Sequence, residues 1–204
     1  MNFDFAEQIN PYLEKQEYKK AISIAEEALK NIPKTDFHSI IGQSLISQAE
    51  GVVQWIDNFY KTVSEIIEPK ALYFEMNEFD INTDTWYIDG FAFSEDGGLN
   101  PEDMEWLCDV SHETMTTEEY VITGYENLQE AFENIEPDTD DLQDARDWSE
   151  QLVIARFMEL MSATHWEAKR QNMEWAELPL YFTEHSYDFI VKSESVREMP
   201  SHNA

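Results

Sequence analysis

The chain has 204 residues, of which 42% are hydrophobic and 13% aromatic, and this composition excludes an intrinsically disordered protein. Acidic residues outnumber basic residues by 43 to 13, which gives a formal net charge of -30 at pH 7. A surface of that sign repels nucleic-acid phosphates and anionic lipids, so we expect no direct binding to nucleic acid and none to a membrane.

Residues 1–70 are predicted to be helical and to pack, as one compact unit, on an acidic α+β region formed by residues 71–204. Between residues 17 and 32, apolar side chains recur at spacings of three and four. This segment resembles one helix of a tetratricopeptide repeat in its small residues and final proline, which are Ala21, Ala25, Ala28 and Pro33. No second copy follows, so we predict an αα-hairpin instead of a repeat array.

A longer helix is predicted over residues 48–66, where apolar side chains again form one face. Ser47 and Glu50 have the spacing of a capping box, in which a hydroxyl and a carboxylate accept hydrogen bonds from free amides at the start of a helix. Pro69 marks the end of the helical region.

From residue 71 the spacing of apolar side chains changes to two, which is typical of strands. Leu72–Met76 and Thr85–Phe93 are rich in aromatic and branched residues, and a short polar linker separates them, so we predict a β-hairpin. A turn at residues 96–98 follows, and Asn100 with Pro101 predicts the start of a short helix that extends through Trp106.

The remaining segments predict a strand and two helices, and then two further strands. In chain order they are a strand at Tyr120–Thr123, a helix at Glu126–Ile135, a long helix at 141–171 capped by residues 138–141, and strands at Leu180–Thr183 and Asp188–Val191. This order does not fit a doubly wound parallel sheet. It predicts an α+β protein with a mostly antiparallel sheet and helices packed on one face, preceded by the N-terminal helical region.

The sequence lacks the motifs of the common catalytic sites, since it has no glycine-rich phosphate loop, no nucleophile elbow and no zinc-type spacing of Cys and His. Residues 80–84 match the first ligands of an EF-hand calcium loop, but Thr85 stands where that loop needs glycine and Phe91 where it needs glutamate. We therefore expect no metal, no cofactor and no catalytic residue, and we expect that the protein is not an enzyme.

Cys108 is the single cysteine, so the chain forms no internal disulfide. Acidic neighbours disfavour its thiolate, and we predict that it packs in the core. The first residues do not have the basic and apolar segments of a signal peptide, and no apolar run approaches the roughly 20 residues of a membrane span. We therefore expect a cytoplasmic protein.

The negative charge is concentrated in the middle of the chain. Residues 71–160 carry a net charge of -23, and no Lys or Arg occurs between Lys70 and Arg146. Because an ordinary surface mixes both signs, this bias indicates a cationic partner. We expect the hairpin and the following helix to contact it, with two tryptophans as anchors; the candidates are Asp84, Trp86, Asp89, Glu95, Asp96, Asp103, Glu105, Trp106 and Asp109. The alternative is that both tryptophans belong to the core and that the charges only keep the protein soluble.

The segments ALYFEMNEFDINTDTWYIDGFAF and DMEWLCDV, within the general layout of residues 37–192, resemble small acidic immunity proteins of bacterial polymorphic toxin systems. The resemblance implies a non-enzymatic inhibitor that covers the active site of a basic cognate toxin. Three alternatives remain: a nucleic-acid mimic that inhibits a DNA- or RNA-handling protein, an enzyme of an unrecognised family, and a helical adaptor with a groove lined by Tyr12, Tyr18 and Trp55.

Overall fold

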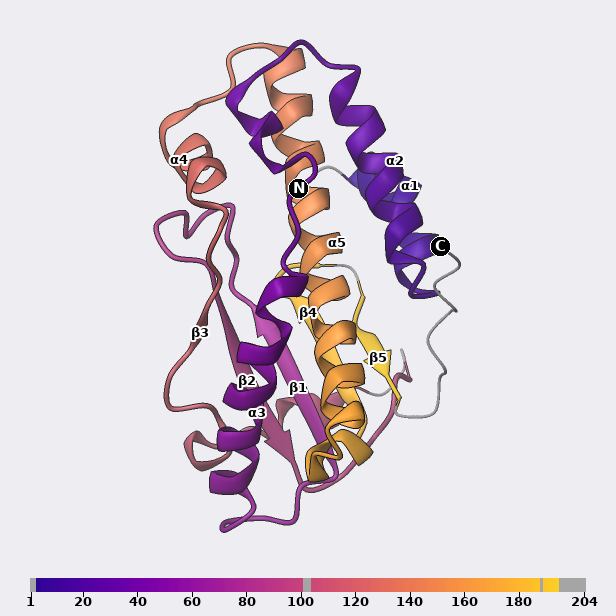
Figure 1. Ribbon diagram of the computed structural model, residues 1–204, viewed down its shortest axis with the longest axis vertical. Helices are drawn as coiled ribbons and strands as arrows, with labels where there is room; N and C mark the ends of the chain where they lie inside the picture. The colour runs from indigo at the N-terminus through magenta and orange to yellow at the C-terminus, as the bar shows by residue number, and fades with distance from the viewer. Residues whose placement is uncertain (1–2, 101–103, 188, 195–204) are drawn as a thin grey trace.

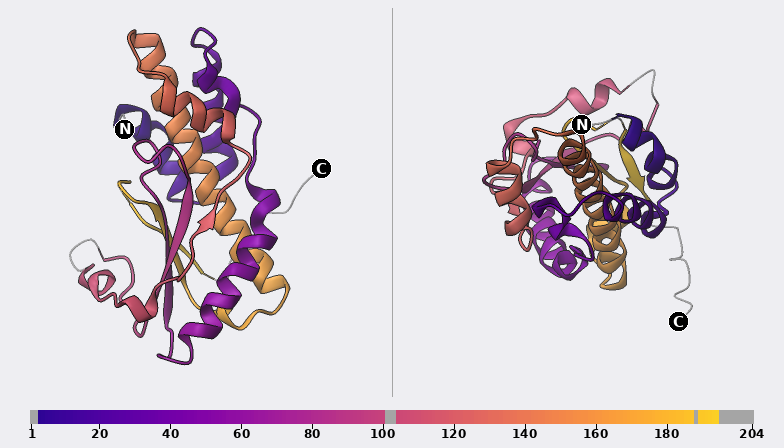
Figure 2. Two further views of the ribbon diagram at one scale, coloured as in Figure 1. Left: turned by 90° about the vertical axis from the view of Figure 1, so that its left-hand side faces the viewer. Right: turned by 90° about the horizontal axis from the view of Figure 1, so that it is seen from above.

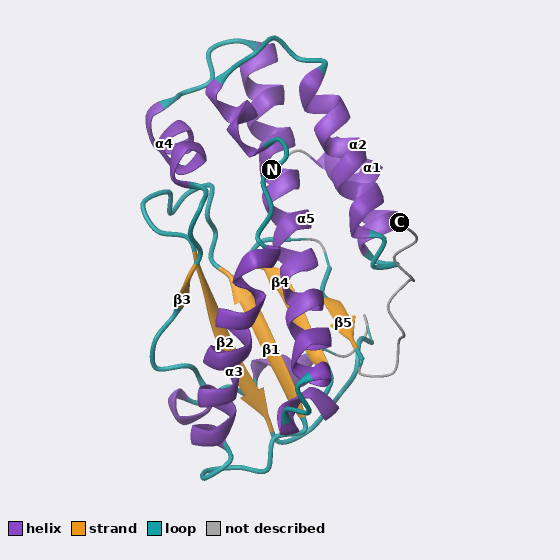
Figure 3. Ribbon diagram, viewed as in Figure 1, coloured by secondary structure: helices purple, strands orange, loops and turns teal. Residues whose placement is uncertain are grey.

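The computed structural model describes residues 3–100, 104–187 and 189–194. It shows the predicted α+β class, with a five-stranded, mostly antiparallel sheet packed against helices (Figures 1 and 3). The long helices lie on one side of the sheet, and a segment of short 3-10 helices lies on the other (Figure 2). Among the described residues, no helix is long and apolar enough to cross a membrane.

The N-terminal region contains a helical hairpin, as the apolar spacing predicts. Helix α1 spans Phe3–Leu13 and helix α2 spans Tyr18–Lys30, and Gln16 turns the chain between them with a φ of 59°. α2 packs along the long helix α5 (Asp140–Arg170), where the Tyr18 hydroxyl lies 2.7 Å from Ser162 Oγ. Buried side chains of this hairpin belong to the same hydrophobic core as those of the sheet.

The predicted capping box of the next helix is wrong. Helix α3 spans Ala49–Val63 and follows directly on a 3-10 turn, η2, at Ile46–Gln48. Ser47 is inside that turn, so its backbone is already helical and cannot adopt the extended conformation that an N-cap needs. Gln48 takes the N-cap position, and its side chain instead holds the distant Thr123 backbone, with Nε2 donating to the carbonyl at 2.9 Å.

The sheet has the strand order β3-β2-β1-β4-β5, and only the β1–β4 pair is parallel. The strands are β1 at Ala71–Met76, β2 at Tyr87–Phe93, β3 at Tyr120–Val121, β4 at Leu180–Glu184 and β5 at Val191–Ser193. β1 and β2 form the predicted hairpin. The last strand begins later than the predicted Asp188–Val191. Phe189 precedes it, and the Phe189 carbonyl accepts a hydrogen bond from the Thr183 hydroxyl at 2.9 Å; Asp188 lies outside the described residues.

Helix α5 is the centre of the core. It has 31 residues, and Thr139 caps it by accepting a hydrogen bond from the Leu142 amide at 3.3 Å. Its middle part is buried on nearly all sides, because it contacts α2, α3 and β4. The helix before it, α4 at Glu126–Asn134, packs against the 3-10 turn η1 at Asp36–Ile40. Both helices were predicted within one or two residues of these bounds.

A second, smaller apolar cluster covers part of the other face of the sheet. Ala71, Phe93 and Tyr181 form it together with Trp106, which belongs to the 3-10 turn η3 at Glu105–Cys108. The predicted start of this helix falls partly on residues 101–103, which lie outside the described residues. Cys108 is exposed, so its predicted core position is wrong, because Trp106 takes the place against the sheet.

Candidate functional site

The side of the sheet that faces away from the long helices carries an unusual set of side chains, and two of them, Tyr73 and Phe91, pack at the edge of the apolar cluster around Trp106. Side chains of a strand point alternately to the two faces. Leu72, Phe74 and Ile88 point to the helices and join the main core. The opposite positions form what we call the outer sheet face, which consists of Tyr73, Glu75, Tyr87, Asp89, Phe91 and Val121.

Two carboxylates of the outer sheet face lie directly opposite each other, since Glu75 of β1 is paired in register with Asp89 of β2. Like charges at such positions destabilise a sheet. Burial and the charges of Glu119 and Glu75 raise the pKa of Asp89. Glu119 comes close because it directly precedes Tyr120, which pairs with Ile88, the neighbour of Asp89. The segment that contains Glu119 also bridges to β2 through Met115 and Phe91.

Two neighbours hold Glu75 in place. The Tyr73 hydroxyl donates to its Oε2 at 2.5 Å, and His185 Nδ1 lies 2.6 Å from its Oε1. The bond to Glu75 raises the pKa of His185, and the nearby charges of Glu78 and Glu184 act in the same direction. Burial and the same carboxylate raise the pKa of Tyr73, so its hydroxyl remains a hydrogen-bond donor at neutral pH.

Aromatic rings flank these carboxylates and are partly exposed. Tyr73 and Phe91 lie opposite each other with ring centroids 5.7 Å apart. Burial raises the pKa of Tyr87, and so do the charges of Asp89, Glu119 and Asp84, which shows that the ring stands in a field of carboxylates. Val121 extends the apolar part of the surface, with 49% of its area exposed.

The two tryptophans predicted as anchors are not at the surface. Trp86 is 0% exposed and packs edge-on against Phe79, Tyr125 and Phe132. Trp106 is also buried, and its Nε1 donates to the Gly98 carbonyl at 3.0 Å. Both side chains therefore belong to the core, which is the alternative that the sequence left open, and the prediction that they anchor a partner is wrong.

The predicted acidic residues are spread over two regions. Asp89 alone belongs to the outer sheet face. Asp96 is tied to the Tyr181 hydroxyl and to Lys192, and although burial opposes it, these bonds and the Gly98 amide lower the pKa of Asp96. Asp103 lies outside the described residues. The others are exposed, in the loop before β2, just after β2 and around η3; they are Asp84, Glu95, Glu105 and Asp109.

Sequence reasoning missed most of the outer sheet face, including Tyr73, Glu75, Phe91 and the adjacent His185. Part of the signal was present, because the alternation in Leu72–Met76 and Tyr87–Phe93 separates two faces. His185 gave no signal, since it is 110 positions away from Glu75 and reaches it only through the parallel pairing of β4 with β1.

The proposed adaptor groove is not formed. Tyr18 is buried against α5, as described above, whereas Trp55 of α3 packs on Phe74 and Tyr120 of the sheet. These two side chains thus serve different parts of the core. In the calcium-like segment, Asn82 Nδ2 donates to the Glu78 carbonyl, and nowhere in the described ranges are three or more His, Cys, Asp or Glu side chains grouped to hold a metal ion.

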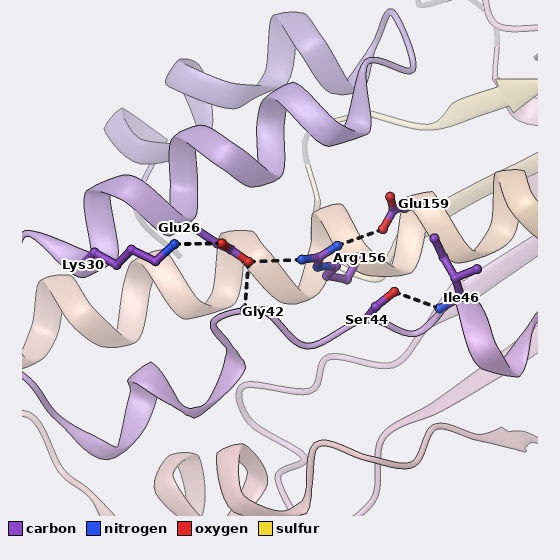
Figure 4. A network of polar contacts seen from close by, with 7 residues as sticks. All are labelled: Glu26, Lys30, Gly42, Ser44, Ile46, Arg156 and Glu159. Carbon is purple, nitrogen blue, oxygen red and sulfur yellow. Dashed lines mark hydrogen bonds and ion pairs between the residues drawn. The ribbon is translucent and has the colours of Figure 1, made fainter. Parts of the chain in front are cut away.

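The acidic middle contains two cations, Arg146 and Arg156, and the fold uses both internally. Arg156 of α5 pairs with Glu26 of α2 and with Glu159, each at 3.1 Å (Figure 4). Glu26 also accepts from the Gly42 amide at 2.9 Å. Although burial opposes the shift, these partners and Lys30 lower the pKa of Glu26.

Arg146 is used in a similar way. Its Nη2 donates to the Asp80 carbonyl at 2.9 Å, and its guanidinium lies over the Phe132 ring at 4.9 Å. It also contacts the buried carboxylate of Glu150. Neither arginine therefore neutralises surface charge.

Chemically, the outer sheet face offers hydrogen-bond acceptors with negative charge next to partly exposed aromatic side chains. Carboxylates accept bonds from ammonium and guanidinium groups, and aromatic faces attract the same cations. Comparisons of this chain with protein-family models, with curated proteins and with solved structures find no match.

Proposed function

We propose that this protein is a non-enzymatic acidic binding protein of the immunity type, which acts in the cytoplasm by binding and neutralising a basic toxin. The proposal specifies the chemistry of the partner, a protein with a cationic surface. It assigns no catalytic residue, metal or cofactor to the chain.

One observation carries the proposal: most of the negative charge of the middle of the chain is left uncompensated at the surface, although Asp96 pairs with Lys192. Every described carboxylate between Lys70 and Arg146 is at least partly exposed. The two arginines of residues 71–160 form ion pairs with buried or partly buried carboxylates of the fold. Such a field raises the rate of encounter with a cationic protein by roughly 10- to 1000-fold at low salt, and fast capture is what neutralising a toxin requires.

The first prediction is that this chain neutralises the product of the gene beside its own. We expect expression of that product alone to arrest growth and co-expression of this chain to restore it. The purified pair should associate at least about tenfold more slowly at 500 mM than at 50 mM NaCl, because salt screens the attraction. Undiminished toxicity together with absent binding at low salt would rule out the proposed function.

Two charge variants of opposite sign provide the control. Reversal of the exposed residues Glu95, Glu105 and Asp109 to Lys should slow association roughly tenfold at low salt. Reversal of the exposed residues Lys15, Lys19 and Lys20 to Glu changes the net charge by the same amount in the other direction. This second variant should not slow association. Equal rates for both variants and the wild type would show that charge does not drive the encounter.

A second candidate function, a nucleic-acid-mimicking inhibitor of a DNA- or RNA-handling protein, is favoured by one further feature. Exposed carboxylates follow one another along α4 and the start of α5; they are Glu126, Glu130, Glu133, Glu136, Asp138, Asp140 and Asp141. A mimic would use this row, so Gln or Asn at all seven positions would abolish its inhibition. An immunity-type inhibitor that binds elsewhere would lose only association rate.

A further inference from the structure

We propose that the outer sheet face is the docking surface for the cationic partner, and that it takes an arginine side chain of that partner between the Glu75–Asp89 pair and the flanking aromatic rings. This inference rests on the proposed function and deepens it, because it names the surface and the group that it binds. It replaces the surface around Trp86 and Trp106 that the sequence predicted.

The charge of the outer sheet face is complementary to a cationic side chain. Glu75 lies opposite Asp89 in the sheet register, and burial together with the charges of Glu119 and Glu75 raises the pKa of Asp89, yet no described Lys or Arg forms an ion pair with any of the three. The one basic group beside them is His185, whose imidazole is neutral or singly charged and is bound to Glu75. A guanidinium would relieve the repulsion across the two strands, so its binding would be stronger than that to an isolated carboxylate.

The arrangement of carboxylates and aromatic rings on the outer sheet face suits a planar cation. Planar guanidinium groups bind carboxylates through two parallel hydrogen bonds and stack on aromatic rings, whereas an ammonium group is compact and more strongly hydrated. Tyr73, Tyr87 and Phe91 present partly exposed rings beside the carboxylates, which suits an arginine better than a lysine.

The carboxylates of the outer sheet face are held on a rigid support. Glu75 and Asp89 are on adjacent central strands of the sheet, and the Tyr73 hydroxyl and His185 fix the Glu75 carboxylate. Little side-chain freedom is left to lose when a partner binds, which lowers the entropic cost of the contact. By comparison, Glu105 and Asp109 are exposed at the η3 turn.

The test uses octa-arginine and octa-lysine peptides as defined probes, with affinities measured by calorimetry at 20 mM NaCl and contacts mapped by amide NMR shifts. We expect octa-arginine to bind more tightly than octa-lysine, by at least about threefold, and to shift the amides of β1 and β2 most. The variant Glu75→Gln/Asp89→Asn should weaken octa-arginine binding about tenfold or more, because two charge-assisted bonds are lost.

The matched control is Glu130→Gln/Glu133→Gln, which removes the same charge from two exposed positions of α4. It should weaken octa-arginine binding less than about threefold, since it reduces only the general field. Asp89→Asn alone keeps the side-chain shape and leaves Glu75 with both partners, so it serves as a second variant if the double variant unfolds, with an expected loss of about threefold.

Equal weakening by the two double variants would show that arginine is held by the overall field, and the outer sheet face would be discarded while the proposed function stands. Equal affinity for the two peptides would contradict the guanidinium assignment. If wild-type protein binds neither peptide at 20 mM NaCl, the inference fails, and neutralisation of the toxin remains to be judged by its own experiment.

Discussion

Glu184 stands at the end of β4 on the helix-covered face of the sheet, with 1% of its surface exposed. Burial and the charges of Asp80 and Glu78 raise its pKa to about 7, although the Ser186 amide donates to its Oε2. The folded protein therefore binds this proton more tightly than the unfolded chain. The ionised side chain costs stability above pH 7, and the cost disappears as the pH falls from 7 toward the unfolded value.

We predict that Glu184→Gln stabilises the protein by roughly 2–3 kcal/mol at pH 8, because an uncharged side chain replaces a buried charge and keeps the acceptor for the Ser186 amide. The melting temperature should rise by roughly 5–10 °C at pH 8 and approach that of the wild type at pH 4.5. Thermal melts at several pH values measure both. Glu133→Gln, at an exposed position, is the control and should change little; a Glu184→Gln variant less stable than wild type at pH 8 would contradict this account.

Among the helices, α2 and α5 share a polar contact that centres on Arg156, beside their apolar packing. Its guanidinium pairs with Glu26 and Glu159, and its side chain is 13% exposed. We predict that Arg156→Gln lowers the free energy of unfolding by roughly 2–4 kcal/mol, because the partly buried Glu159 loses its cation and Glu26 keeps Lys30 alone. Chemical denaturation at pH 7 measures the change.

The same helix provides the control for that experiment. Arg170 pairs with Glu167 near the end of α5, but its side chain is 60% exposed. Since exposed ion pairs contribute about 1 kcal/mol or less, Arg170→Gln should change stability by no more than that. If both substitutions cost the same, the Arg156 contact is not a structural link between the two helices.

Elements could be predicted from local patterns, whereas contacts between distant elements could not. Period-two spacing predicts β1 and β2, and it also places Trp86 and Ile88 on one face and Tyr87 and Asp89 on the other. The predicted partner surface combined Trp86 with Asp89 and so mixed two faces. Local spacing does not say which face the helices cover, because both faces of the hairpin carry aromatic residues.

Contacts between residues that are distant in the sequence determine the features that local patterns do not predict. Ser47 has the residue type of an N-cap, yet the preceding 3-10 turn continues through it, and the side chain of Gln48 is engaged by Thr123 of a later segment. Likewise, Asp96 is predicted as a free surface charge but is held by Tyr181 and Lys192 from β4 and β5. Residue type and spacing do not predict such distant partners.

For the molecule as a whole, the net charge of -30 is the dominant electrostatic quantity. Repulsion among exposed carboxylates opposes the compact state, while the few ion pairs favour it. Salt weakens both effects, since the screening length is about 10 Å at 0.1 M. The repulsion acts among many charges that lie farther apart than the two groups of an ion pair, so salt screens the repulsion more completely. The balance therefore favours stabilisation by salt.

We predict that the melting temperature at pH 7 rises by several degrees, roughly 3–8 °C, between 10 and 500 mM NaCl. The triple variant Lys15→Glu/Lys19→Glu/Lys20→Glu adds negative charge at three exposed positions, so it should melt lower than wild type in 10 mM salt and recover more of the difference in 500 mM. Thermal melts of both proteins in a salt series measure this effect. A melting temperature that falls with salt would mean that ion pairs such as Arg156–Glu26 outweigh the repulsion. The net charge of -30 would then destabilise the fold less than its magnitude suggests.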